Sequence, residues 1–348
     1  MADKPDRVTA GPDQRGARKP GRLERVLAAA EFAVTAEIGP PRGADAEPVR
    51  RKAALLRDWV DAVNLTDNQS ATVRLASWAA SLAALAAGVE PIMQLTCRDR
   101  NRIALQSELI SAAAMGIPNV LLMTGDDPRH GDHPDATPVF DIDSTQLMRV
   151  ARTMRDEGLL MSGRKIDPAP SWFIGAVESH SGPADSGTGR LAAKVAAGAQ
   201  FVQTQFVFDV PAFAAWMSRV REAGLHERCS ILAGVGPILN LRALDHLQHR
   251  VPGVHVPDQV ADRLRAAGPD GIAAAGTRLC AQTIGQLSQI PGVAGVHVMA
   301  VANERAIPGI LELAGLPART SLPAGSSLPA QASLPARTSL PAGRPDAP

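Results

Sequence analysis

The carboxylate of Glu37 is the first side chain in this sequence whose setting suggests chemistry. Glu37 lies in the segment Thr-Ala-Glu-Ile-Gly-Pro-Pro, near the end of the apolar run Phe32–Ile38. A carboxylate at the end of a buried strand is costly unless it is paired or used, and a carboxyl group that keeps its proton in a site can act as a general acid. Two interpretations stay open: a general acid, or a carboxylate in a salt bridge with a neighbour such as Arg42.

Hydrogen-bonding side chains also follow three later apolar runs. Residues 66–69, Thr-Asp-Asn-Gln, could bind a polar ligand or cap the next helix. Gln205 offers a donor and an acceptor that suit the amide edge of a heterocycle, or that could bridge two loops. Asp126 follows Gly125, which lets backbone approach a ligand closely, but Gly-Asp-Asp-Pro is also good turn chemistry. These side chains could form one site if the fold brings the runs together.

Three further clusters carry weaker signals. The arginines within residues 94–102 suit phosphate groups, and they equally suit a solvated face. Cys97 has no base beside it, which disfavours a nucleophile. His130 and His133 match no standard metal spacing, so we expect no metal. No GxGxxG segment follows an apolar run, which argues against a Rossmann dinucleotide site.

Eight short apolar runs are each followed by a helix-like stretch or by a loop and a helix. Eight βα units is the number at which a parallel sheet closes into a barrel, and the carboxyl ends of the strands then carry the chemistry. The sequence therefore predicts an α/β fold, a (β/α)8 TIM barrel with the polar residues above at its mouth. The predicted strands are Phe32–Ile38, Asp61–Thr66, Glu90–Thr96, Asn119–Thr124, Trp172–Val177, Gln200–Phe206, Cys229–Val235 and Val293–Met299.

The segments between these runs show the apolar spacing of helices. Gly88, Gly116 and Gly315 follow such segments and are expected to end them, since glycine adopts the left-handed conformation of helix ends. The predicted helices cover residues 23–30, 47–60, 72–87, 102–114, 145–156, 190–197, 211–223, 239–249 and 304–314, with two more in 257–287 that are split at 268–271.

Composition changes at both ends of the chain. Residues 1–20 are polar and rich in Gly, Pro and Arg, and we predict a disordered segment there. The barrel is predicted over 21–315. From 316 to 348, Ser-Leu-Pro-Ala recurs every six residues, which is too short a unit for a solenoid. We predict a disordered, partly polyproline-II tail that adds nothing to the core, so that deletion of 317–348 is expected to be neutral. A ligand for a proline-recognising domain is an alternative.

Charge and composition exclude several classes of protein. The formal net charge is +1, aromatic residues make up 3% of the chain and Tyr is absent, so we expect no nucleic-acid partner. The three cysteines are far apart and form no CxxC pair, which suits a reducing cytosol. No run of 18 apolar residues occurs, and the N-terminal segment has no apolar signal region. We therefore expect a cytoplasmic protein with no membrane partner.

Six segments, in order and each at or near the end of a predicted strand, make the chain resemble the methylenetetrahydrofolate reductase family over about residues 24–315. The variants at 64–69 and 98–102 resemble the branch found in anaerobes and other bacteria with one-carbon pathways. The matching segments are Thr-Ala-Glu-Ile-Gly-Pro-Pro-Arg (35–42), Val-Asn-Leu-Thr-Asp-Asn-Gln (63–69), Gln-Leu-Thr-Cys-Arg-Asp-Arg-Asn-Arg (94–102), Thr-Gly-Asp (124–126), Lys-Val-Ala-Ala-Gly-Ala (194–199) with Gln-Thr-Gln-Phe (203–206), and Gly-Val-Gly-Pro-Ile-Leu-Asn (234–240).

The resemblance implies an oxidoreductase that reduces 5,10-methylenetetrahydrofolate to 5-methyltetrahydrofolate, in one-carbon metabolism and methionine biosynthesis. It implies FAD as the cofactor, which NAD(P)H reduces before the folate takes its place and accepts hydride. The five-membered ring of the folate must open to a cationic iminium, and this step needs a proton delivered towards N10. Two alternatives remain: electrons supplied by a partner flavoprotein or ferredoxin, or a folate-binding subunit of a one-carbon complex. A homo-oligomer or a redox partner protein is compatible with either.

The resemblance also implies roles for individual residues. Glu37 matches the family's acid, and Asp126 matches the aspartate beside flavin and folate. Gln205 matches the residue that grips the pterin. Thr66 and Lys194 match flavin contacts, and Lys194 and Arg190 are candidate phosphate partners of the cofactor.

The chain departs from the family pattern at four places. Asp67 stands where many members have Tyr, Thr124 replaces the usual Arg before Gly-Asp, and Gln94 replaces the usual His of the third strand. Glu178-Ser-His-Ser replaces the common sequence after the fifth strand, so no role is transferred to those residues. Because Tyr is absent throughout, aromatic packing on a flavin must be supplied differently.

Overall fold

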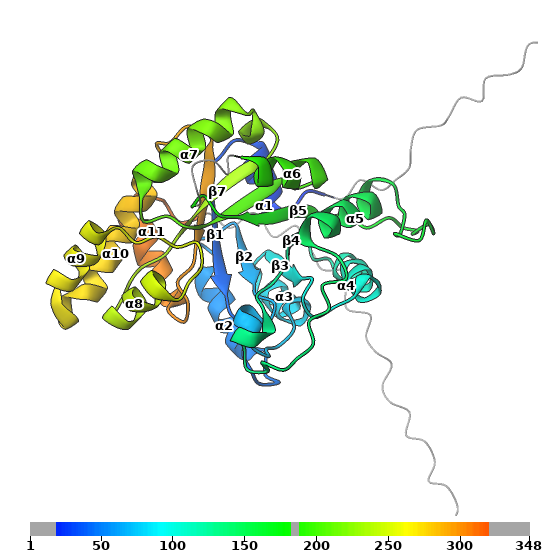
Figure 1. The fold of residues 1–348 in the computed structure, drawn as a ribbon, viewed down its shortest axis with the longest axis horizontal. Helices are drawn as coiled ribbons and strands as arrows, with labels where there is room; N and C mark the ends of the chain where they lie inside the picture. The colour runs from blue at the N-terminus through cyan, green and yellow to red at the C-terminus, as the bar shows by residue number, and fades with distance from the viewer. Residues whose placement is uncertain (1–18, 182–187, 320–348) are drawn as a thin grey trace, which may run out of the picture.

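A computed structural model describes residues 19–181 and 188–319 of the chain. Within them, eight parallel strands form a closed barrel in chain order, with β8 paired to β1 (Figure 1). The predicted (β/α)8 barrel is therefore confirmed. Most of the predicted disordered ends, 1–20 and 316–348, lies outside the described residues. The strands are β1 (Ala33–Ile38), β2 (Ala62–Leu65), β3 (Pro91–Thr96), β4 (Asn119–Met123), β5 (Phe173–Glu178), β6 (Phe201–Phe206), β7 (Ser230–Val235) and β8 (Val293–Val298).

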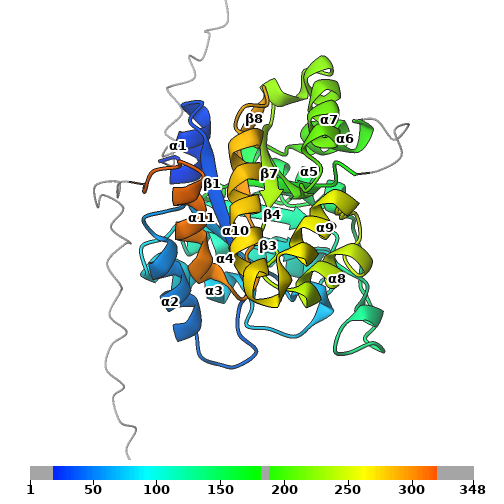
Figure 2. The ribbon, with the colours of Figure 1, turned by 90° about the vertical axis from the view of Figure 1, so that its left-hand side faces the viewer.

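Helices surround the barrel, and Figure 2 shows β1 beside β8 where the sheet closes. Short 3-10 helices, including η1 (Gln69–Ala71) and η5 (Glu304–Ala306), lie in the loops. The α-helices are α1 (Arg22–Ala28), α2 (Glu47–Leu56), α3 (Ser77–Ala86), α4 (Arg102–Ala114), α5 (Ser144–Asp156), α6 (Gly189–Ala197), α7 (Val210–Glu222), α8 (Leu241–His249), α9 (Asp258–Ala266), α10 (Gly268–Leu287) and α11 (Ile307–Leu313).

Several helix boundaries differ from the prediction: α2 ends at Leu56 instead of residue 60, and residues 304–306 form a 3-10 helix before α11. Two other differences have a visible physical cause. The helix expected from 72 begins only at Ser77, because the chain before it is held in a loop: the Arg74 amide donates to Asn68 Oδ1, and the Leu75 amide donates to the carbonyl of Pro41. The break between the two helices expected at 268–271 lies at Ala267, between α9 and α10. Pro269 is in the first turn of α10, a position where its missing N–H costs no hydrogen bond.

Side chains on each strand alternate between the barrel interior and the layer beneath the helices. On β1, Val34, Ala36 and Ile38 pack in the large cluster between sheet and helices. Ala33 instead joins an inner cluster at the amino end of the barrel, which includes Phe201. Alternation therefore places Thr35 and Glu37 on the inner face, one above the other.

Helix α1 closes the amino end of the barrel. Leu23 is fully buried in the inner cluster, and the Leu23 amide donates to Glu90 Oε1 at 3.1 Å. Burial raises the pKa of the Glu90 carboxyl. At the opposite, carboxyl end of the barrel lie the loops that follow the strands.

The chain after α11 docks at the same amino end. Leu316 packs against the core, and Arg319 donates to the carbonyl of Phe32 at 2.7 Å. Arg319 also lies 3.6 Å from the buried carboxylate of Asp61, which Arg22 contacts at 3.1 Å. Residues 316–319 fall within the predicted tail, and the contacts of Leu316 and Arg319 with the barrel were not expected from the sequence.

Candidate active site at the barrel mouth

Glu37 sits at the carboxyl end of β1, with 12% of its side chain exposed. Gln69 Nε2 donates to Glu37 Oε1 at 3.3 Å, and Gln94 Nε2 donates to Oε2 at 3.4 Å. His297 Nε2 lies 3.9 Å from the same Oε2. Across the described residues, no lysine or arginine forms an ion pair with Glu37, so the alternative of a salt bridge with Arg42 is not observed. The carboxylate is surrounded by amide and imidazole groups instead.

A layer of buried polar side chains lies directly below Glu37. Thr35 Oγ1 lies 3.0 Å from His297 Nδ1 and accepts a hydrogen bond from Gln203 Nε2 at 3.1 Å. Gln203 and Asn64 exchange two hydrogen bonds, at 2.6 and 3.1 Å. All four residues are at most 3% exposed. These residues lie inside the barrel and not at the strand ends, so they were not predicted. The signal in the sequence is a polar residue at an inward position of a predicted strand.

The loop after β2 contacts both predicted catalytic carboxylates. Gln69 reaches Glu37, and the next residue, Ser70, donates its amide to Asp126 Oδ2 at 3.1 Å. Asn68, Ser70 and Ala71 all have positive φ, between 45° and 56°. Backbone strain of this kind persists only where surrounding contacts enforce it, and it is concentrated at functional sites.

Arg98 holds the loops that carry these contacts. Its side chain is 3% exposed, and its guanidinium donates to the carbonyls of Asp126 at 3.3 Å and Asn68 at 3.2 Å, while pairing with Asp99 at 2.7 Å. Gly125, at φ 93°, lies so close to Thr96 that a Cβ would approach its side chain to 3.0 Å. The Gly-Asp turn is therefore tightly fitted against β3, and Asp126 itself is exposed at the mouth.

The other arginines of the 94–102 segment also have protein partners. Arg100 pairs with the fully buried carboxylate of Asp67 at 2.8 Å and with Glu108 at 2.7 Å. Arg102 pairs with Asp141 at 2.7 Å. A phosphate would therefore have to compete with these carboxylates for the two arginines.

Thr66 and Asp67 directly follow β2, and both are buried. Asp67 Oδ2 accepts from the amide and hydroxyl of Thr96, both at 2.9 Å, so this residue braces β3. Thr66 is 1% exposed, and within the described part of the chain its buried Oγ1 has no hydrogen-bond partner. An orphaned hydroxyl at the mouth fits a position that a bound group would complete.

Arg190 and Lys194 on α6 share one buried partner, Glu178 at the end of β5. The distances are 3.1 Å from Arg190 and 2.9 Å from Lys194, which also donates to the carbonyl of Val177 at 2.6 Å. The side chain of Lys194 is 16% exposed, whereas that of Arg190 is 65% exposed. Of the two predicted phosphate partners, Arg190 is the one open to a ligand here.

Gln205 contacts the loop between α8 and α9 instead of the other site residues. Its Nε2 donates to the carbonyl of Pro252 at 3.2 Å, and its Oε1 accepts from the amide of Phe206 at 3.0 Å. The loop after β2 thus contacts both Glu37 and Asp126, whereas Gln205 contacts the loop between α8 and α9.

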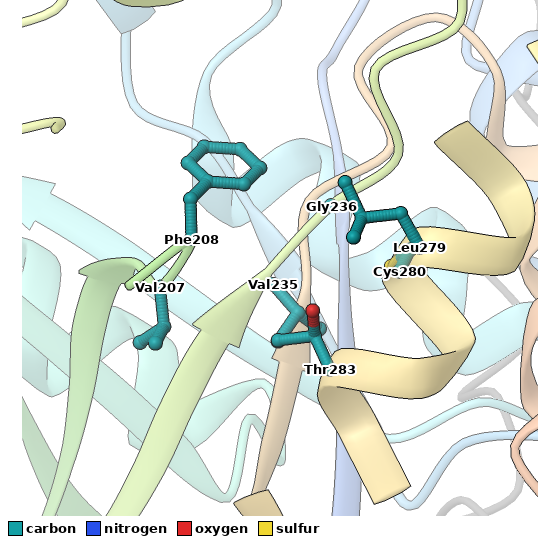
Figure 3. Close-up of a pocket in the computed structure, with 7 residues that line it drawn as sticks. All are labelled: Val207, Phe208, Val235, Gly236, Leu279, Cys280 and Thr283. Carbon is teal, nitrogen blue, oxygen red and sulfur yellow. The ribbon is translucent and has the colours of Figure 1, made fainter. Parts of the chain in front are cut away.

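A pocket outside the barrel mouth contains none of these residues. Figure 3 shows it between the ends of β6 and β7 and helix α10, lined by Phe208, Val235 and Cys280 among others. Burial raises the pKa of the thiols of Cys280, Cys229 and Cys97 to about 12. At Cys97, the charge of Asp143 adds to this rise. The thiols are therefore neutral and poor nucleophiles.

Residues 19–181 and 188–319 contain neither a candidate metal cluster nor a candidate membrane-spanning helix. No group of three or more His, Cys, Asp or Glu side chains there could hold a metal ion. No helix in the same residues is long and apolar enough to cross a membrane.

Comparison with known proteins identifies relatives of the whole barrel. The family model described as methylenetetrahydrofolate reductase matches residues 22–315. A probable methylenetetrahydrofolate reductase (NADPH) from Caenorhabditis elegans is 24% identical over 306 residues, covering 85% of this chain and 44% of that protein. Methylenetetrahydrofolate reductase 1 from Schizosaccharomyces pombe is 28% identical over 234 residues, covering 66% and 36%. The chain thus matches less than half the length of these curated relatives.

A solved structure supports the fold. It is described as an uncharacterized protein from Clostridium thermocellum that binds two copies of 5-methyl-5,6,7,8-tetrahydrofolic acid. The TM-score is 0.60 at 13% identity, and the alignment covers 84% of this chain and 97% of that one. At this identity the likeness shows a shared fold.

Proposed function

Because the chain belongs to the methylenetetrahydrofolate reductase family, we propose that it reduces 5,10-methylenetetrahydrofolate to 5-methyltetrahydrofolate in the cytoplasm, with FAD as cofactor and NAD(P)H as electron donor. The observation that carries this proposal is the loop after β2, which contacts Glu37 through Gln69 and Asp126 through Ser70. It brings an acid and a second carboxylate to one part of the barrel mouth, where barrel enzymes carry out their chemistry.

Glu37 has the surroundings that a proton donor needs. Opening of the folate ring requires a proton at N10, and a carboxyl group can deliver it only if no cation holds it as a permanent carboxylate. The contacts of Glu37 are the side chains of Gln69, Gln94 and His297, at 3.3 to 3.9 Å. Loose contacts of this length are common before a substrate completes a site.

Asp126 supplies the negative charge that the cationic iminium requires. One carboxylate oxygen is held by the Ser70 amide, and the carbonyl of the same residue is held by Arg98. A fixed charge of this kind stabilises developing positive charge without reorganising during the reaction. Gln205 can bind the pterin once its amide exchanges the Pro252 carbonyl for the ligand, since that amide has both a donor and an acceptor.

The residues at the mouth fit a flavin in part. Thr66 Oγ1 is buried without a partner in the described chain. The guanidinium of Arg190 pairs with Glu178 but is 65% exposed, so its remaining N–H groups could bind a phosphate. Lys194 could bind the same phosphate only if it broke its ion pair with Glu178. A bound flavin would accept hydride from NAD(P)H and donate it to the methylene carbon of the folate.

Two measurements on the purified full-length chain test this proposal. The absorbance spectrum of the protein should show flavin bands, and NAD(P)H with methylenetetrahydrofolate should yield 5-methyltetrahydrofolate. If flavin bands are present but turnover occurs only after a reduced flavoprotein or ferredoxin is added, the electron donor is that partner protein and not NAD(P)H. Binding of folate without reduction by any of these donors would reject the proposed activity.

A further inference from the structure

The polar layer below Glu37 is a continuous path across the barrel interior. Hydrogen bonds run from Asn64 on β2 to Gln203 on β6, then to Thr35 on β1 and His297 on β8. Beyond the last of them, His297 Nε2 faces Glu37 Oε2 at 3.9 Å, which is longer than a hydrogen bond. Four buried polar side chains inside a barrel require a complete set of partners, because an unsatisfied buried donor or acceptor costs about 1–3 kcal/mol. The donor and the acceptor of each hydrogen bond along the path can therefore be assigned.

The two amide side chains set the direction of the path. Gln203 Oε1 accepts from Asn64, and Gln203 Nε2 donates one hydrogen to Asn64 Oδ1 and the other to Thr35 Oγ1. Thr35 is thus an acceptor on this side. Its single hydroxyl proton is free for its other neighbours.

The hydroxyl proton of Thr35 has two acceptors within reach. These are His297 Nδ1 at 3.0 Å and the carbonyl of Val296 at 3.4 Å, and the shorter contact has ordinary hydrogen-bond length. Donation to Nδ1 makes that nitrogen the acceptor of the imidazole ring. In a neutral imidazole the proton then resides on Nε2, which is the atom facing Glu37.

The contact with Glu37 favours the same tautomer independently. With the proton on Nδ1, the lone pair of Nε2 would face the carboxylate oxygen at 3.9 Å. With the proton on Nε2, a positive N–H dipole faces it. In the described chain, Glu37 is the acidic group that pairs with His297, and the strand neighbours of His297 on β7 and β1 are Gly234 and Thr35.

We propose that His297 is a positioning residue for Glu37: the Asn64–Gln203–Thr35 path holds it as the neutral Nε2–H tautomer, and this N–H orients the carboxyl group for proton transfer. The part of this inference that concerns proton transfer rests on the function proposed above. The N–H stabilises the carboxylate that remains after Glu37 gives up its proton. Because the lone pair of Nδ1 accepts the hydrogen bond from Thr35, that nitrogen is not open to the substrate's proton.

The tautomer is measured directly by 15N NMR of the full-length chain labelled at histidine, which needs no turnover. We expect His297 to carry its proton on Nε2 at neutral pH. Thr35→Val removes the donor to Nδ1 and should mix the two tautomers, whereas the matched control Thr35→Ser keeps the hydroxyl and should keep the tautomer. An imidazolium ring, a proton on Nδ1, or an unchanged ring in Thr35→Val would overturn the inference.

The rates of folate reduction and flavin reduction in a His297 variant then test whether this residue positions Glu37. His297→Asn has a shorter side chain and removes the N–H that faces Glu37. It should slow folate reduction about tenfold, or about 1.4 kcal/mol, and should shift the acid-dependent limb of the pH profile to higher pH. Flavin reduction by NAD(P)H should keep its rate. An unmoved limb, or equal slowing of both steps, would show that His297 is merely structural. If the wild-type protein does not reduce folate, the proposed function fails while the tautomer result stands.

Discussion

The amide of Ser70 donates to the carboxylate of Asp126 at 3.1 Å, and this contact joins the loop after β2 to the turn after β4. Ser70 adopts φ 56°, a conformation that a serine rarely takes without enforcement. Since Gln69 reaches Glu37 in the same turn of chain, movement of this loop would displace both carboxylates together. The geometry of the candidate site therefore depends on backbone that is held by its neighbours.

Asp126→Asn should keep the fold and alter the redox chemistry. The side chain is exposed, so the substitution removes a charge without opening a cavity. Loss of a negative charge near a flavin should raise its reduction potential and slow folate reduction more than flavin reduction. Potentiometry and stopped-flow kinetics check both effects. An unchanged potential together with unchanged folate kinetics would remove Asp126 from the site.

Asp67→Ala should destabilise the barrel strongly. Asp67 is buried and pairs with Arg100. Burial alone would lower the pKa of the Arg100 guanidinium, but the carboxylates of Asp67 and Glu108 have the larger effect and raise it. Removing one partner of a buried pair costs about 3–5 kcal/mol of the free energy of unfolding. Urea denaturation measures it. The control is Asp141→Ala, whose pair with Arg102 is exposed and should matter little; equal losses in both variants would contradict the account.

Truncation of the tail should depend on where the cut is made. Deletion of 320–348 should leave the thermal midpoint unchanged. Deletion of 317–348 also removes Arg319 and its contacts with Phe32 and Asp61, and should cost about 1–3 kcal/mol. Arg319→Ala in the full chain should reproduce most of that loss. Equal midpoints for the two deletions would mean that Arg319 does not anchor the end of the barrel domain.

His180 should make the fold sensitive to mild acid. Burial lowers the pKa of this imidazole to about 4, and its ring packs edge-on against Phe213. Since the folded state disfavours the protonated ring, His180 reduces the free energy of unfolding as pH falls from about 6.5, the unfolded value, towards 4. Chemical denaturation at several pH values should show a shallower fall in His180→Leu. Parallel curves for the two proteins would exclude His180 as the cause.

The strands were predictable because each is a short apolar run, and the structure reproduces all eight within two residues at each end. The candidate site residues at the strand ends were predicted from the same pattern. What sequence could not supply is contact between distant elements. The pairing of Lys194 with Glu178 depends on how α6 packs beside β5, and the loop before α3 depends on Pro41. Local pattern contains neither.

Glu37→Gln tests the central claim most directly. Gln is nearly isosteric and should leave the barrel folded, and reduction of the flavin by NAD(P)H needs no proton from residue 37, so stopped-flow should show that step at wild-type rate as the internal control. Reduction of methylenetetrahydrofolate needs an acid, and loss of general acid catalysis should slow that step about 10²–10⁴-fold. A variant that reduces methylenetetrahydrofolate at the wild-type rate would show that Glu37 is not the proton donor.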